Sequence, residues 1–193
     1  MTQYEDRSYV ETMIEFSSIT TRGGDSGETS LYSGERRSKD DPLFEALGDL
    51  DELNSWLGLI KVSLENGTGK DAGEIMNWIQ DRIIVASGEI AAPKISKAYK
   101  KLDHITNTDI DELESKQAGM MEHMDMPDCF VHPGFNRLSA ETDIARSVCR
   151  RCERRVVTLI RRQGLSHLNE IQRYLNRLSD FLYVLARDAA RRQ

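Results

Sequence analysis

Apolar residues recur at three- and four-residue steps over five stretches of the chain, a spacing that places them on one face of an α-helix. The first stretch begins at Pro42, with Asp41 before it as the cap, and ends at Asn66-Gly67. The second runs from about Asp71 to Ala92 and stops before Pro93. The inward positions of these two predicted helices are Leu43, Ala46, Leu47, Leu50, Leu53, Leu57, Ile60, Ile75, Ile79, Ile83, Ala86 and Ile90.

The third stretch is weaker, with Thr108 and Asp111 as a capping box and an end before Pro127. The fourth runs from about Arg137 to Gln163 and ends at Gly164. Its predicted apolar face consists of Ile144, Val148, Cys152, Val156, Leu159 and Ile160.

The fifth stretch follows Ser166, and its inward positions are Leu168, Ile171, Leu175, Leu178, Leu182 and Leu185. Alternation of apolar and polar residues, which would indicate a strand, is confined to short stretches near the N-terminus. Long helices with short links predict an all-α, antiparallel five-helix bundle. Residues 19–193 would form this domain, and residues 1–18 a polar leader that is extended or disordered.

The bulk composition excludes several classes of protein. No apolar run approaches the length of a membrane span, and the acidic N-terminus lacks the apolar core of a signal peptide. Three cysteines are an odd number, which does not make a disulfide framework and favours a reducing cytoplasm.

Charge is distributed unevenly along the chain. The net charge is −6, yet the part from Arg137 onward has thirteen Arg, no Lys and six acids. The planar guanidinium suits phosphate or carboxylate partners. The acidic remainder argues against a nucleic-acid binder, an interpretation that would require steeply salt-dependent affinity.

Three of these arginines, Arg146, Arg150 and Arg154, follow one another at four-residue steps and form a stripe on the fourth helix. Like charges at this spacing repel, so an anionic partner is one explanation and a solvated surface is the other. Glu153, three residues after Arg150, can neutralise and orient it.

The segment Thr20–Asp41 is rich in glycine, hydroxyl and charged residues. It contains no GxxxxGK[ST] motif, so it is not a Walker loop. Its glycines would let backbone N–H groups approach an oxyanion, and Asp25 could hold a Mg²⁺ bound to phosphates. A flexible linker and a phosphate site both remain open on composition alone.

Polar residues interrupt the apolar pattern of the last helix at Asn176, Arg177 and Asp180. A structural hydrogen-bond network is one interpretation, and a ligand-facing Asn176 is the other. Cys149 and Cys152 are interpreted as core residues because a zinc site needs four ligands. No histidine forms a Glu-x-x-His pair, which argues against a ferritin-type di-iron site.

Six motifs together resemble those of the PduO-type ATP:cob(I)alamin adenosyltransferases. In chain order they read "TRGGDSGET" at 21–29, "GERRSKDD" at 34–41, "EALGDLDELNS" at 45–55, "FVHPGF" at 130–135, "ARSVCRRCERR" at 145–155 and "YLNRLSDFLY" at 174–183. The resemblance implies a ferritin-like five-helix bundle that assembles as a homotrimer. ATP would lie between subunits, under the glycine-rich loop of one and against the Arg-rich helix of the next.

The resemblance also implies the site residues. ATP and its Mg²⁺, held through the phosphates, would be bound by Thr21, Arg22, Gly23, Gly24, Asp25, Gly27, Thr29, Ser30, Lys39, Arg150, Glu153, Arg154 and Asn176. Asp51 and Arg146 match an intersubunit salt bridge. Phe130 matches the aromatic residue that lies under the corrin ring and excludes its lower axial base.

The activity implied is transfer of the 5′-deoxyadenosyl group of ATP to cob(I)alamin, with Arg150, Lys39 and Phe130 as catalytic residues. No general base is needed, which agrees with the lack of a nucleophile–base constellation. The alternative is a non-catalytic module that senses ATP or escorts a cobalamin. A cob(II)alamin reductase and an adenosylcobalamin-dependent enzyme are the further partners that the resemblance suggests.

Three positions depart from the family pattern. Phe135 replaces a glycine, His132 an aliphatic residue, and Asp143 a histidine. All three are expected to flank the corrinoid pocket, so they bear on corrinoid affinity or preference rather than on ATP.

Overall fold

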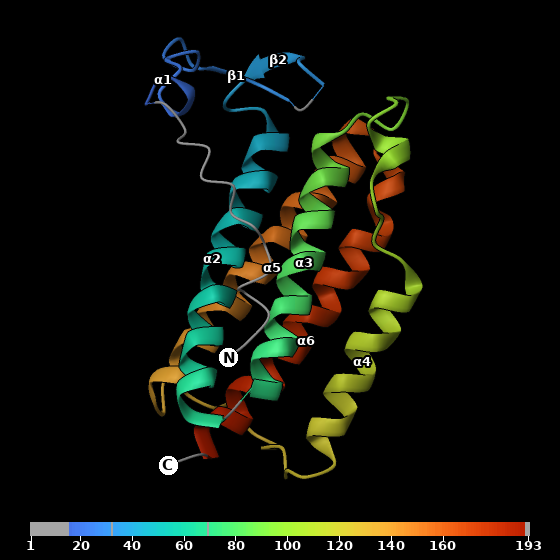
Figure 1. Ribbon diagram of the computed structural model, residues 1–193. Coiled ribbons are helices and arrows are strands. Elements are labelled where there is room, and N and C mark those ends of the chain that lie inside the picture. Colours follow the sequence, from blue (N-terminus) through green and yellow to red (C-terminus); the bar gives the residue numbers. More distant parts are fainter. Residues whose placement is uncertain (1–15, 32, 69, 192–193) are drawn as a thin grey trace.

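Among the described residues, five long helices lie side by side, and helices that follow one another in sequence run in opposite directions, as the apolar spacing predicts (Figure 1). The computed structural model describes residues 16–31, 33–68 and 70–191. The helices are α2 (Pro42–Thr68), α3 (Lys70–Ala91), α4 (Asn107–Met121), α5 (Arg137–Gln163) and α6 (Asn169–Arg191). Within the described ranges, no helix has the length and apolar content to cross a membrane.

Local capping sets the ends of several helices. The N–H of Leu43 donates to the Asp41 carboxylate at 2.9 Å, so Asp41 caps α2 as predicted. Gly164 ends α5 with φ of +71°, a conformation that glycine adopts without strain.

The capping box predicted at Thr108 and Asp111 is wrong by two residues. The box is formed by Thr106 and Asp109, whose carboxylate accepts hydrogen bonds from the Thr106 N–H and hydroxyl, both at 2.8 Å. Asp109 also pairs with Arg82 of α3 at 3.3 Å. This contact between helices favours Asp109 over Asp111 as the first acid of α4.

The core is built from the predicted apolar faces. Leu53, Leu57 and Ile60 of α2 are completely buried, and they belong to the same cluster as Leu175 and Leu182 of α6. Cys149 and Cys152 are buried free thiols, which confirms their assignment to the core. Burial raises the pKa of the Cys152 thiol to about 12. Burial also raises the pKa of the Cys149 thiol, so neither thiol is set up as a nucleophile.

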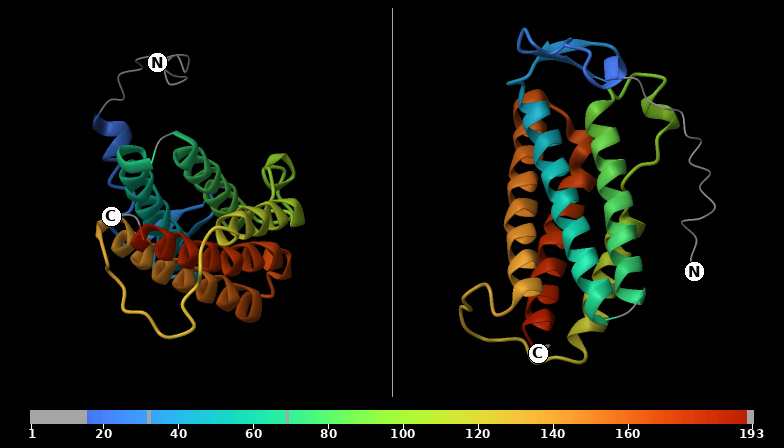
Figure 2. Two further views of the ribbon diagram at one scale, coloured as in Figure 1. Left: turned by 90° about the horizontal axis from the view of Figure 1, so that it is seen from below. Right: turned by 60° about the vertical axis from the view of Figure 1, so that its left-hand side comes forward.

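Ile144 is the exception to the predicted face of α5. Its side chain is 43% exposed and lines a groove rather than the core. It lies near the N-terminus of α5, where the loop that joins α4 to α5 stands away from the helices (Figure 2).

The glycine-rich segment contains a small antiparallel hairpin that the alternation pattern did not predict. Strands β1 (Glu28–Ser30) and β2 (Arg36–Ser38) pair with Thr29 opposite Arg37. A four-residue helix, α1 (Phe16–Ile19), precedes the hairpin. The expectation of an extended or disordered leader concerns residues 1–15 above all, which lie outside the described residues.

The two ends of the bundle carry different features. The hairpin stands over the end where α2 begins and α5 ends, next to the short 3-10 helix η2 (Ser166–Leu168) (Figures 1 and 2). A second 3-10 helix, η1 (Tyr99–Lys101), lies in the connection from α3 to α4. The loop between α4 and α5 lies at the opposite end (Figure 2).

Candidate active site

The glycine-rich segment is folded into a defined loop by its own backbone and cations. The Arg36 guanidinium donates to the Gly23 carbonyl at 3.0 Å and pairs with the Glu28 carboxylate at 3.2 Å. The Lys39 N–H donates to the Gly27 carbonyl at 2.9 Å. Leu31 is buried in the core cluster and fixes the hairpin to the bundle. The segment is therefore a built loop and not a slack linker.

Gly24 and Lys39 lie in direct contact within this loop. A Cβ atom placed on Gly24 would lie 2.9 Å from the Lys39 Nζ, so a larger residue here would displace the flexible end of the lysine side chain. The Lys39 side chain is exposed and makes no ion pair with the described residues. The structure brings together in this one loop the predicted ligands Thr21, Arg22, Gly23, Gly24, Asp25, Gly27, Thr29, Ser30 and Lys39.

The arginines of α5 divide into two sets by the face they occupy. Arg151 pairs with Asp49 and Glu52 of α2, and Arg155 pairs with Asp49 and with Glu45 at 2.6 Å. These two arginines are therefore neutralised within the chain and join α5 to α2.

Arg150 and Arg154 are exposed. Among the described residues neither has an ion-pair partner, although Arg154 donates to the Arg150 carbonyl at 3.0 Å. The Arg150 guanidinium is thus available to an anion from outside the chain.

Glu153 does not orient Arg150, contrary to the sequence prediction. Its carboxylate instead accepts a hydrogen bond from the Asn176 amide at 3.1 Å. Asn176 in turn accepts from Arg177 at 2.5 Å, and Arg177 pairs with Glu114 of α4. The neutral amide of Asn176 on α6 is the donor to the Glu153 carboxylate, so Glu153 positions Asn176. The guanidinium of Arg150 therefore stays free.

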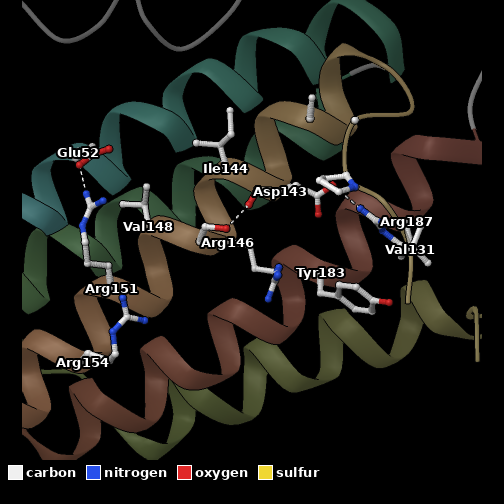
Figure 3. A pocket seen from close by; sticks show the side chains of 14 residues that line it. Glu52, Val131, Asp143, Ile144, Arg146, Val148, Arg151, Arg154, Tyr183 and Arg187 are labelled. Atoms are coloured by element: carbon white, nitrogen blue, oxygen red, sulfur yellow. Dashed lines mark hydrogen bonds and ion pairs between the residues drawn. The ribbon is translucent and has the colours of Figure 1, made fainter. Parts of the chain in front are cut away.

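A groove of about 640 Å³ runs along α5 and includes the first and last arginines of the stripe (Figure 3). Arg146, Arg151 and Arg154 line it, whereas Arg150 is not among its lining residues. The Tyr183 ring of α6 lies between two cations, with the guanidinium carbons of Arg146 and Arg187 at 5.9 and 5.3 Å from its centre. Such contacts hold both guanidiniums over the ring face.

Asp143 is the partner of Arg187, a residue that the sequence analysis did not single out. Their nearest atoms are 2.5 Å apart, and the two side chains are 12% and 5% exposed, respectively. An arginine four residues after Tyr183 on a strongly amphipathic helix was the only available signal. The departure from the family pattern at Asp143 is thus one half of a buried ion pair.

Replacing Asp143 with alanine should lower the free energy of unfolding by about 3 kcal/mol, because it leaves the Arg187 guanidinium buried without a counter-charge. Urea unfolding measures this. The matched control is Asp180→Ala, which removes an exposed carboxylate 3.9 Å from Arg177 and should cost less than about 1 kcal/mol. Equal losses in the two variants would contradict a structural role for the buried pair.

Neither of the two predicted intersubunit residues has an ion-pair partner in the described part of the chain. Asp51 is exposed on α2 and forms no ion pair with any described residue. Arg146 contacts no acid in the described chain, and its Nε is buried without an acceptor. The structure does not bring Asp51 and Arg146 together in one chain.

The other parts of the predicted site also lie far apart within one protomer. Arg150 is thirteen residues before the end of α5, which places it roughly 20 Å along the helix from the end that carries the hairpin. Phe130 is fully exposed on the loop at the opposite end. Lys39, Arg150 and Phe130 are therefore not neighbours within one chain.

No cluster of three or more His, Cys, Asp or Glu side chains within the described ranges could hold a metal ion. At the hairpin Asp25 is exposed and makes no ion pair with another described residue. This donor set suits a cation that arrives already bound to phosphates better than one held by the protein alone.

A model of the family described as cobalamin adenosyltransferase matches residues 19–189. The chain belongs to this family. It is 36% identical over 177 residues to the human corrinoid adenosyltransferase MMAB, covering 91% of this chain and 70% of the relative. It is 38% identical to a cobalamin adenosyltransferase of Cupriavidus metallidurans, covering 89% of this chain and 87% of that protein.

Solved structures of the PduO-type ATP:corrinoid adenosyltransferase from Lactobacillus reuteri share the fold. A phenylalanine-to-alanine variant complexed with cobalamin and ATP superposes with a TM-score of 0.80 at 28% identity, covering 89% of this chain and 93% of that chain. An arginine-to-lysine variant complexed with ATP gives 0.78 at 30% identity over the same shares. The all-α bundle predicted from the sequence is confirmed.

Proposed function

We propose that this chain transfers the 5′-deoxyadenosyl group of ATP to the cobalt of cob(I)alamin, which gives adenosylcobalamin and triphosphate. Membership of the cobalamin adenosyltransferase family supports the activity. The observation that carries the proposal is that the chain has both a folded glycine-rich loop and the Arg150 guanidinium, which no acid in the described chain neutralises.

The catalytic site is formed by two chains of a homotrimer. The loop and Arg150 are too far apart to bind one triphosphate within a protomer, so a loop from one copy meets the arginine stripe of the next. Three such head-to-tail contacts close a ring. Asp51 of one copy would then neutralise Arg146 of its neighbour, since neither residue pairs with a described residue of its own chain.

Lys39 and Arg150 stabilise the leaving triphosphate in this arrangement. The bond from C5′ to the triphosphate oxygen breaks, its electron pair leaves on the triphosphate, and Co(I) supplies the two electrons of the new cobalt–carbon bond. Negative charge therefore grows on the leaving group, where fixed cations lower its energy most. Mg²⁺ bound to the phosphates would add to this neutralisation.

Positioning is the other requirement, because attack at carbon needs no proton transfer. The hydrogen bond from Asn176 to Glu153 fixes both side chains on the α5–α6 face beside Arg150. The exposed Thr21 and Ser30 and the half-buried Thr29 offer hydroxyls that can hold the nucleotide in line with the cobalt.

Phe130 covers the lower face of the corrin ring and excludes the axial base, which makes Co(II) easier to reduce. Its ring is fully exposed in the protomer, so it is free to meet a ligand. Phe130→Ala should reduce turnover at least about tenfold with cob(II)alamin and a reductant, but much less when Co(I) is supplied chemically. Parallel assays measure both rates, and equal losses would contradict the axial-ligand role.

A binding module without chemistry is the alternative function. Incubating the purified protein with ATP, Mg²⁺ and a Co(I) corrinoid separates the two functions. Formation of a cobalt–carbon bond, seen by absorbance, together with release of triphosphate supports the enzyme. Tight binding of both ligands without either product would support the module.

The compartment and further partners follow from chemistry. Cys129, Cys149 and Cys152 are all free thiols, in keeping with a reducing compartment such as the cytoplasm. Because Co(I) must be generated before each turnover, a cob(II)alamin reductase is the expected supplier, and an adenosylcobalamin-dependent enzyme the expected consumer.

A further inference from the structure

Two large aromatic side chains are exposed on the loop between α4 and α5. Phe130 is fully exposed and Phe135 is 65% exposed. Both line a cavity of about 500 Å³, here named the loop pocket, together with Met124, Pro127, Val131 and Ala190. Exposed apolar surface gathered in one cavity is typical of a ligand site.

The same pocket carries cations beside its apolar wall. Arg187 and Arg191 of α6 contribute two guanidiniums, and His132 adds an exposed imidazole. Asp125 is the single acid among the lining residues. Arg187 is 95% buried and held by Asp143, and its Nε–H is buried without an acceptor.

The loop pocket adjoins the groove along α5. Val131 and Arg187 line both cavities, so the two cavities share one loop residue and one α6 residue. Figure 3 shows both residues at the edge of the α5 groove. A macrocycle seated over Phe130 would therefore have the α5 groove on one side and the loop pocket on the other.

We propose that the loop pocket binds the nucleotide tail of the corrinoid after its base has left the cobalt. The inference rests on the proposed function. The tail is covalently attached to the macrocycle and joins the cobalt from its lower face, which Phe130 covers. The displaced base must lie near Phe130, and the loop pocket is lined by Phe130 itself.

The chemistry of the pocket matches the two parts of the tail. The aromatic base stacks on the faces of Phe130 and Phe135, an interaction typical of bases on aromatic side chains. The phosphodiester carries one negative charge and lies toward Arg191 and His132 at the polar edge. His132 and Phe135 are two of the three departures from the family pattern, so tail binding is a property of this chain's own loop.

The test compares two corrinoids that differ only in the tail. Equilibrium binding of cob(II)alamin and of cob(II)inamide, which lacks the nucleotide, is measured on the ATP-loaded oligomer. Phe135→Gly should weaken the binding of cob(II)alamin about tenfold, which is the loss expected for one stacking contact. It should weaken the binding of cob(II)inamide less than twofold. Phe135→Leu, which keeps an apolar side chain but removes the π face, should show the same selectivity.

The charge contribution is tested in the same way. Arg191→Gln should weaken the binding of cob(II)alamin, and the loss of affinity should be about three times larger at low salt than at high salt. The binding of cob(II)inamide should be unaffected. The matched control is Arg162→Gln, which removes an exposed guanidinium at the opposite end of the bundle and should affect neither ligand.

Equal weakening of both corrinoids by Phe135→Gly and Phe135→Leu would overturn the proposal. If the oligomer also dissociates in sedimentation, the occupant of the pocket is a second copy of the chain. Failure of the proposed function is a separate result, because it would appear as a wild-type protein that forms no cobalt–carbon bond with either corrinoid.

Discussion

Arg150→Ala is expected to lower kcat for adenosyl transfer roughly a hundredfold to a thousandfold, the usual cost of removing one fixed donor from a developing anion. Arg150 is exposed and has no ion-pair partner in the described chain, so its removal should break nothing inside the protomer. Steady-state kinetics with chemically reduced corrinoid measure the loss, and sedimentation checks that the oligomer is intact.

Arg155→Ala is the matched control for this variant. It removes the same charge from the same helix, but its guanidinium is held by Glu45 and Asp49 on α2. We expect a small loss of stability and near-normal kcat. Near-normal turnover in Arg150→Ala would remove this residue from the mechanism.

Mixing two inactive chains should restore activity, because Lys39 and Arg150 of one site come from different copies. In a random ring of Lys39→Ala and Arg150→Ala chains, an intact site needs an intact loop from one chain and an intact helix from the next. About one quarter of the sites meet this condition. The chains are mixed unfolded, refolded together and assayed against each variant refolded alone.

A second mixture tells a shared site from one within a single chain. Wild-type chains are refolded with equal amounts of a double variant that carries both substitutions. A site within one chain would leave about half of the wild-type activity, whereas a shared site leaves about a quarter. Activity no higher than that of the separate variants in the first mixture, together with one half in the second, would refute the two-chain site.

Much of the fold could be read from the sequence because its signals are local. The bounds of α5 agree with those predicted, since the apolar period and Gly164 both act within one turn of the helix. Asp41 caps α2 for the same reason. The hairpin was not predicted because strands of three residues are too short to show alternation, and the Arg36–Glu28 pair and its turns decide it.

The candidate residues could be named in advance, but their partners could not. Glu153 is three residues from Arg150 in sequence, yet the amide of Asn176 lies within 3.1 Å across the helix interface and takes its place. Asp143 stood out as unusual, whereas its partner Arg187, forty-four residues away, did not.

The sequence by itself determined five amphipathic helices, a loop rich in glycine and a helix rich in arginine, because periodicity and composition are properties of neighbouring residues. Only the tertiary structure decided which arginines are available. Packing α5 against α2 brings Arg151 and Arg155 to acids about a hundred residues earlier and leaves Arg150 exposed. Ion pairs depend on distance in space, and the order of residues along the chain does not contain that distance.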